Sequence, residues 1–346
     1  MQTFKLSYHQ GDLPENGRIL VAPLNWGIGH ATRCIPIINQ LIEGGYKPVI
    51  ASDGEALQLL QKVFPKLKSY RLPAYKVRYT KNSWFFKLKI LRQFPHLYKT
   101  YKQEQLFIAD LLQKDVIDAI ISDNRFGVFS KEIFSIYITH QLRVKSGFTT
   151  FLTGFLHRRI FSKFDKIWIP DVANTPNLSG VLSHQINLKN PMSYIGLLSQ
   201  FKKEIVPKKY DILVLLSGPE PQRTILEKQL FKLLKNSDKE VCFIKGKVSD
   251  KVEKQIQKKV TVYNFLFGVQ LQRIINQSEL VIARSGYSTI MDLAVLQKKA
   301  FFIPTPGQDE QLYLAKHLAK QKVAPFSCQR NFTLRELDTL NEYKGF

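Results

Sequence analysis

Short apolar runs alternate with amphipathic stretches along the whole chain. The first run, residues 18–22, leads into the polar loop 23–30, and residues 31–42 then place apolar side chains at helical spacing. Further runs that predict buried strands lie at 48–51, 119–122, 136–139, 166–170, 211–216, 241–244, 260–262, 280–283 and 300–303. Because strand, loop and helix follow one another repeatedly, the pattern predicts parallel sheets in an α/β protein.

The rhythm is interrupted once and then restarts. Residues 196–209 are polar and basic around Pro207, which indicates a linker. The sequence thus predicts two doubly wound Rossmann-like domains, residues 1–200 and 201–330, and a C-terminal helix within 331–346. The cleft between two such domains is the usual place for a ligand. Ser52 with Glu55, and Thr333 with Glu336, have capping-box spacing and predict two helix starts.

Loops that follow the strands of a parallel sheet meet at one edge. Loops 23–30, 123–125 and 140–143 should therefore converge in the first domain. Asp123, Asn124 and Arg125 are candidates for lining that crevice, although the same residues suit a self-satisfied Asx turn. His140, at another strand end, fits a structural role better than a catalytic one.

Composition limits the choice of class. The chain has 346 residues, 44% of them apolar, so both domains can build cores. The first 16 residues lack the apolar run of a signal peptide, and no unbroken apolar stretch reaches spanning length. Three scattered cysteines form neither a disulfide framework nor a zinc pattern, which favours a cytoplasmic protein.

The formal net charge of +23 concerns partners more than fold. Residues 56–103 hold 12 basic residues, ten aromatic residues and no acidic one, including Trp84-Phe85-Phe86. A solvated basic face is the ordinary explanation, but this mixture is also typical of an interfacial patch on an anionic membrane. Nucleic acid is the weaker alternative, because no recognition motif accompanies the charge.

The segments with the most specific chemistry are 283–292 and 302–311. Ser285-Gly286 ends a predicted strand and opens a helix, and free amides at a helix N-terminus bind anions such as a diphosphate. Asp292 lies six residues beyond Gly286, where its carboxylate can accept ribose hydroxyls. Polar side chains suited to sugar hydroxyls follow at Gln308, Asp309, Glu310 and Gln311.

These two segments resemble glycosyltransferase family 28, the MurG-like family with the GT-B fold. The matching residues are Arg284, Ser285, Gly286, Thr289, Pro304, Asp309 and Gln311. Asp292 stands where the family has a ribose-binding Glu, and Gly307 stands where it has a His. The resemblance also implies that the backbone at Asn264-Phe265-Leu266 contacts the nucleobase, which favours uridine.

Two further loops resemble parts of related transferases. Ser217-Gly218, within 217–221, resembles a glycine-rich loop that faces the donor but keeps one glycine, and Arg223 is a candidate cation for the phosphates. Gly27, Gly29, His30 and Arg33 resemble the acceptor-side Gly-x-Gly-His-x-x-Arg loop, which a nucleotide-sugar hydrolase family shares. A helix N-terminus lowers an imidazole pKa, so His30 suits a general base, although it could merely cap its helix.

The sequence therefore predicts an inverting, metal-independent hexosyltransferase that needs no cofactor beyond a nucleotide sugar. The donor is a UDP-hexose or UDP-N-acetylhexosamine, and the acceptor is unidentified, with a lipid-linked compound at the inner face of the membrane as one candidate. No Asp-x-Asp motif occurs, in line with metal independence. The alternatives are a nucleotide-sugar hydrolase of the same fold and a binding module without catalysis.

Overall fold

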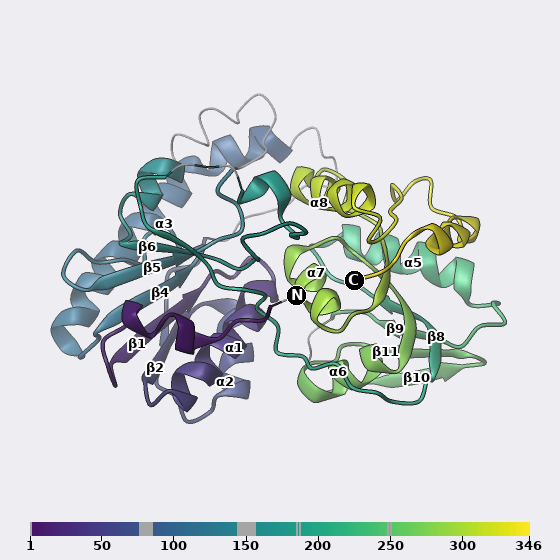
Figure 1. The fold of residues 1–346 in the computed structure, drawn as a ribbon, viewed down its shortest axis with the longest axis horizontal. Helices are drawn as coiled ribbons and strands as arrows, with labels where there is room; N and C mark the ends of the chain where they lie inside the picture. The colour runs from purple at the N-terminus through teal and green to yellow at the C-terminus, as the bar shows by residue number, and fades with distance from the viewer. Residues whose placement is uncertain are drawn as a thin grey trace. The chain divides into compact units, whose positions relative to one another are not determined.

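The computed structural model describes residues 2–75, 86–143, 157–184, 186, 188–247, 249 and 251–346. The chain divides into two compact units, the first ending at Ser199 and the second running from Gln200 to Phe346 (Figure 1). The C-terminal residues 331–346 belong to the second unit.

The first unit is built on a seven-stranded parallel sheet of order β3-β2-β1-β4-β5-β6-β7. Its strands are β1 (Arg18–Pro23), β2 (Lys47–Ser52), β3 (Ser69–Arg71), β4 (Ala119–Asp123), β5 (Phe134–Ile138), β6 (Lys166–Ile169) and β7 (Met192–Tyr194). Its helices are α1 (Gly29–Glu43), α2 (Gly54–Val63) and α3 (Phe86–Lys114), with short 3-10 turns at Leu6–Tyr8, Gln10–Asp12 and Gly180–Leu182.

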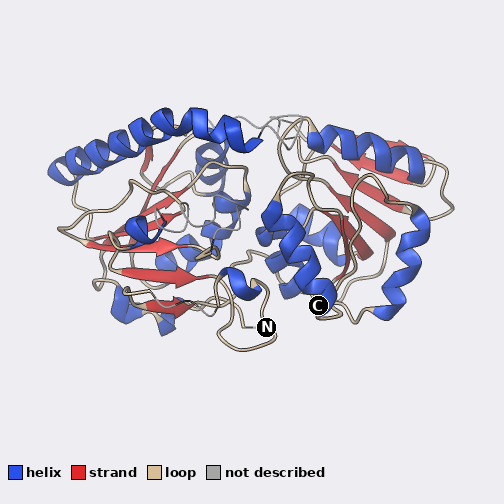
Figure 2. Ribbon diagram, turned by 90° about the horizontal axis from the view of Figure 1, so that it is seen from above, coloured by secondary structure: helices blue, strands red, loops and turns tan. Residues whose placement is uncertain are grey.

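Helices cover both faces of this sheet (Figure 2). On one face, Ile108 and Leu111 of α3 pack with Leu20, Val49 and Ile120 from three neighbouring strands. Since the central strands are buried on both sides, they read as continuous apolar runs, which is why the sequence predicted them.

The second unit has a six-stranded sheet of order β10-β11-β9-β8-β12-β13. Its strands are β8 (Tyr210–Leu215), β9 (Val241–Ile244), β10 (Lys254–Gln257), β11 (Val260–Tyr263), β12 (Ser278–Ala283) and β13 (Lys299–Phe302), and only β10 pairs antiparallel. Its helices are α5 (Gln222–Leu234), α6 (Gly268–Asn276), α7 (Tyr287–Val295) and α8 (Asp309–Lys320), followed by a 3-10 helix, η6 (Leu334–Glu342).

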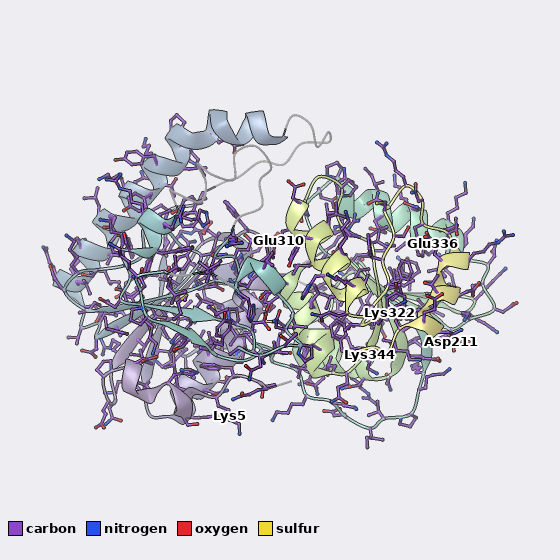
Figure 3. All side chains as sticks on the ribbon, turned by 45° about the horizontal axis from the view of Figure 1, so that its top comes forward. Lys5, Asp211, Glu310, Lys322, Glu336 and Lys344 are labelled. Atoms are coloured by element: carbon purple, nitrogen blue, oxygen red, sulfur yellow. The ribbon has the colours of Figure 1, made fainter. Side chains whose placement is uncertain are left out.

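The second unit's core lies between its sheet and α5. Leu226, Leu230 and Leu234 recur at helical spacing on α5 and pack with Val214 and Phe243 from the central strands. The chain end returns to this unit, since the Lys344 N–H donates to the Lys322 carbonyl at 2.9 Å, and Figure 3 labels both residues.

The two capping-box predictions had different outcomes. Thr333 and Glu336 form a capping box, although the helix they open is 3-10 rather than α. The prediction at Ser52 was wrong: Ser52 ends β2, and its buried hydroxyl donates to the Pro23 carbonyl at 2.8 Å. The helix begins at Gly54, with Asp53 as its N-cap.

Candidate functional site

In the first unit, His30 and Asp123 meet at the carboxyl ends of β1 and β4. The two strands are neighbours, and their register places Pro23 beside Asp123. The chain leaves β1 through a short loop, in which the Leu24 N–H donates to the Asp123 carbonyl at 2.9 Å. His30 then lies on the first turn of α1, with its Nδ1 3.1 Å from Asp123 Oδ1.

Asp123 is a fully buried carboxylate held by cations. Arg33, one turn further along α1, grips both of its oxygens: Nε donates to Oδ2 at 2.6 Å, and Nη2 donates to Oδ1. Burial opposes ionisation, but Arg33 and His30 together outweigh it and hold the pKa of Asp123 well below its usual range. Asp123 is therefore a permanent anion beneath His30.

The pKa of His30 is lowered, chiefly by burial and then by the positive charge of Arg33, while Asp123 acts in the opposite direction. The direction agrees with the sequence prediction, although its leading cause is burial. An ionised Asp123 accepts a hydrogen bond from Nδ1–H, which fixes the neutral tautomer and leaves Nε2 as an acceptor. Among the described residues no group hydrogen-bonds to Nε2, and the side chain keeps 14% exposure. A neutral imidazole held in this way can act chemically as a proton acceptor.

The three loops predicted to converge do so within this unit. Loop 140–143 joins the pair above through His140, whose Nδ1 lies 3.4 Å from Arg33 Nη1. Gly27 has a φ of +85°, and a side chain there would meet no atom within 4 Å in the part of the chain that the structure describes, so the loop before His30 presents bare backbone. Gly29 is the first residue of α1.

Arg125 differs from the acceptor-side role expected of it. Its guanidinium is fully buried, donates to the Pro23 and Pro73 carbonyls, and pairs with the carboxylates of Asp53 and Glu104. These contacts favour a structural role. Asn124 takes a φ of +58° and accepts a hydrogen bond from the Tyr137 hydroxyl at 3.1 Å.

In the second unit, Arg284 ties together the loops that were predicted to hold the donor. It follows β12 directly and is buried, with Nη1 donating to the Ile303 and Pro304 carbonyls at 3.0 and 3.1 Å. Nη2 donates to the Gln222 carbonyl at 3.0 Å and to Gln329 Oε1 at 2.7 Å. Burial lowers its pKa to about 10, so it stays protonated at neutral pH. The described contacts of Arg284 thus position the loops around it.

The tip after β12 is an open helix N-terminus. Gly286 caps α7, and a side chain there would meet no atom of the described residues within 4 Å. The first helical hydrogen bond runs from the Ile290 N–H to the Gly286 carbonyl, and the Ser288 and Thr289 amides donate to no described group. Asp292 lies half-buried one turn further on. These amides and the helix dipole suit an anion.

The loop after β13 is fastened to this tip. The Ser285 hydroxyl donates to the Gln311 carbonyl at 2.8 Å, and the Gln311 side chain accepts from the Thr305 amide at 2.8 Å and donates to Gln308 at 2.6 Å. Gln311 is therefore partly engaged within the loop. Asp309 and Glu310 occupy the first turn of α8, where Figure 3 labels Glu310.

The stretch predicted to contact the base has unused backbone groups. Asn264 accepts hydrogen bonds from the Glu253 and Phe265 amides, both at 2.8 Å, and so fixes the turn after β11. The Leu266 N–H and C=O have no partner within the described part of the chain, while the Phe265 and Leu266 side chains are buried. Backbone groups presented in this way can pair with a base edge.

The loop after β8 differs from expectation at Arg223. Ser217 is half-buried, and Gly218 is exposed with a φ of +100°. The Arg223 guanidinium is buried; it pairs with Glu220 and Glu227 and donates to the Lys245 carbonyl at 2.8 Å. These contacts favour a structural role over the phosphate contact expected from the sequence.

The basic aromatic segment 56–103 is described only in part. Residues 76–85, with Trp84 and Phe85, lie outside the described residues. On α3, Tyr98 is 54% exposed, with the Lys102 ammonium 5.8 Å from its ring centroid. None of the described helices combines the length and the apolar character needed to cross a membrane.

Residues 220–340 match the family model described as the glycosyltransferase family 28 C-terminal domain. They run from α5 into η6 and include the loop residues to which Arg284 donates hydrogen bonds. Over these residues, the second unit is therefore similar to the family 28 C-terminal domain. The resemblance stated from segments 283–292 and 302–311 is confirmed.

A curated relative extends the similarity beyond this domain. An uncharacterized glycosyltransferase of Methanopyrus kandleri is 24% identical over 284 residues, which cover 77% of this chain and 79% of the relative. Together with the family 28 domain, it supports glycosyltransferase activity.

Solved structures show that the fold is GT-B. The kitacinnamycin glycosyltransferase superposes with a TM-score of 0.66 at 12% identity, over 95% of this chain and 91% of that one. Acinetobacter baumannii MurG gives 0.52 at 15% identity, covering 94% and 89%. Phytolacca americana UGT2, solved with UDP-2fluoro-glucose and pterostilbene, gives 0.61 at 13% identity, covering 95% and 88%.

Proposed function

We propose that the chain transfers a hexose or N-acetylhexosamine from a UDP-sugar to an acceptor hydroxyl, with inversion at the anomeric carbon. The observation that carries this proposal is the His30–Asp123 pair, in which a buried anion orients an imidazole whose Nε2 is left to accept a proton. Sugar transfer to a hydroxyl needs such a base, because the neutral hydroxyl is a weak nucleophile.

The second unit would hold the donor. The Ser288 and Thr289 amides donate hydrogen bonds to the diphosphate, and the Asp292 carboxylate accepts hydrogen bonds from the ribose hydroxyls. The Leu266 backbone pairs with the base. UDP is favoured because UGT2, which shares the GT-B fold, was solved with a UDP-sugar. The roles of the α7 amides, Asp292 and Leu266 are proposed from the resemblance to family 28 and from the chemistry of segment 283–292.

The proposed step is one displacement. His30 Nε2 removes the proton of the acceptor hydroxyl as that oxygen forms a bond to the anomeric carbon. The bond from this carbon to the β-phosphate oxygen breaks on the opposite face, and UDP leaves with the electron pair. The α7 dipole and amides stabilise the negative charge that develops on UDP, the task a divalent metal performs in other transferases. The reaction would thus need neither metal nor cofactor.

The acceptor is proposed from the charge pattern. Segment 56–103 has no acidic residue, and an anionic membrane contributes about 1 kcal/mol of binding for each basic residue close to its surface. A lipid-linked acceptor, met by peripheral attachment at the cytoplasmic face, is consistent with this composition. Binding to vesicles that contain phosphatidylglycerol, but not to neutral vesicles, tests this part separately.

The donor is identified by a thermal-shift panel of UDP, TDP, GDP and ADP, followed by their sugars. A nucleotide present at a hundred times its Kd stabilises the protein by about 2.7 kcal/mol. We expect UDP and one UDP-sugar to give the largest shifts. Release of free sugar at an equal rate with and without acceptor would favour the hydrolase alternative instead, and a panel without any shift would contradict the proposed donor.

A further inference from the structure

Beside the donor loops of the second unit lies a cluster of charges that takes no part in the reaction above. Its cations are Arg223, Lys245 and Lys247, and its carboxylates are Glu220 and Glu227. Three positive charges meet two negative ones, so the cluster has a net charge of +1. An additional anion would balance it.

The three cations are held to different degrees. Arg223 is buried and pairs with both carboxylates. The Lys245 ammonium lies 3.1 Å from Glu227 Oε1 and keeps 29% exposure. The Lys247 ammonium lies 3.8 Å from Glu227 Oε2, beyond hydrogen-bond range, and its side chain is 49% exposed. Lys247 is therefore the cation that can leave the cluster most easily.

The backbone fixes where these lysines stand. They follow β9 at the carboxyl edge of the sheet, and the Lys247 N–H donates to the Asn264 carbonyl at 2.9 Å. Gly246 between them has a φ of +67°, and a side chain there would clash with the Leu216 carbonyl oxygen. The turn is thus packed between the loop that begins at Ser217 and the stretch that continues to Leu266.

We propose that Lys247 binds the diphosphate of the nucleotide-sugar donor, exchanging its weak pairing with Glu227 for a phosphate oxygen. The inference deepens the proposed function and depends on it, since it assumes that a nucleoside diphosphate occupies this edge. A lysine is suited to the task because its charge sits on a flexible four-carbon stem. Arg223 and Arg284 are buried and bonded to protein groups. An exposed lysine can therefore supply the positive charge that these arginines do not offer to the diphosphate.

The test compares UDP and uridine by isothermal titration. In Lys247→Gln, we expect UDP to bind roughly 10- to 100-fold more weakly, the range expected for one charge-assisted hydrogen bond, and uridine to bind as in the wild type. Lys247→Arg, which keeps the charge, should restore most of the UDP affinity. Lys299→Gln is the matched control, because Lys299 is exposed at the opposite, amino end of β13.

Each outcome of these titrations supports or overturns the role of Lys247. Unchanged UDP affinity in Lys247→Gln would overturn the inference and leave the donor site intact. Equal weakening of UDP and uridine would also overturn it, because the lysine would then act on the nucleoside rather than the diphosphate. A wild-type protein that binds neither compound would overturn the proposed donor itself, and this inference with it.

Discussion

Equivalent strand ends of the two units carry buried residues of opposite charge. β4 and β12 occupy the same place in their sheets, each between the first strand of its unit and the next strand along the chain. β4 ends in Asp123, a buried anion that gathers His30 and Arg33. β12 is followed by Arg284, a buried cation that gathers backbone carbonyls.

The connections after these strands explain the difference. After β12, helix α7 begins within a few residues, so free amides stand at the strand end. After β4, a loop leads to β5, and the nearby helix start belongs to α1, which contributes His30 and Arg33. One topology therefore gives an edge suited to proton transfer in the first unit and an edge suited to anions in the second.

Replacing His30 should have the largest effect. His30→Gln removes the proton acceptor, and we expect kcat to fall about 10²- to 10⁴-fold, the usual contribution of a general base. The measurement is steady-state transfer with the donor found by the panel. UDP affinity and thermal midpoint should stay at wild-type values; a kcat within threefold or so of wild type would contradict the role.

Replacing Arg284 should chiefly affect stability. Arg284→Met leaves several carbonyls without their buried donor, so we expect the free energy of unfolding to fall by roughly 3–5 kcal/mol. Urea denaturation measures it. Arg335→Met, at an exposed arginine of η6, is the matched control and should change stability by less than about 0.5 kcal/mol. Equal effects in the two variants would contradict the loop-positioning role of Arg284.

Replacing Asp292 should affect the donor alone. Asp292→Ala removes the proposed ribose acceptor, so we expect the donor KM to rise about 10- to 100-fold, as for a hydrogen bond to a charged group. Asp292→Glu, the side chain that family 28 has there, should remain within a few-fold of wild type. Donor kinetics at saturating acceptor provide the measurement, and an unchanged KM in Asp292→Ala would remove the assignment.

The smallest expected effect is the change of kcat with pH. A base must be neutral to act, and the pKa of His30 lies below its ordinary value of 6.5 because of burial and Arg33. Activity should therefore stay constant as pH falls from 8 to about 6.5 and decline only below that. A profile of kcat against pH checks this. An acidic limb centred above 6.5 would mean that Asp123 dominates the environment of His30.

The sequence predicted those features that a single local pattern specifies. Apolar runs located ten strands because these strands are buried, and segment 283–311 identified the family. β3, β7 and β10 were missed because they are short or exposed, and α3 was missed because its basic and aromatic residues drew attention to charge rather than periodicity.

Pairings between distant residues could not be read from the sequence. Asp123 lies 93 positions from His30 in the sequence, and the two residues meet because β1 and β4 are paired strands. No sequence signal distinguishes Arg125, Arg223 and Arg284 from arginines that bind ligands, because their burial depends on carboxylates and carbonyls supplied by other elements. The loops were predictable; the division of their side chains between structure and ligand was not.

The most direct test of this division is UDP titration of three proteins side by side. If the second unit holds the donor and the first supplies the base, wild type and His30→Gln will bind UDP with equal Kd, and Asp292→Ala will bind it at least about tenfold more weakly. Loss of UDP binding in His30→Gln together with wild-type affinity in Asp292→Ala would contradict the account.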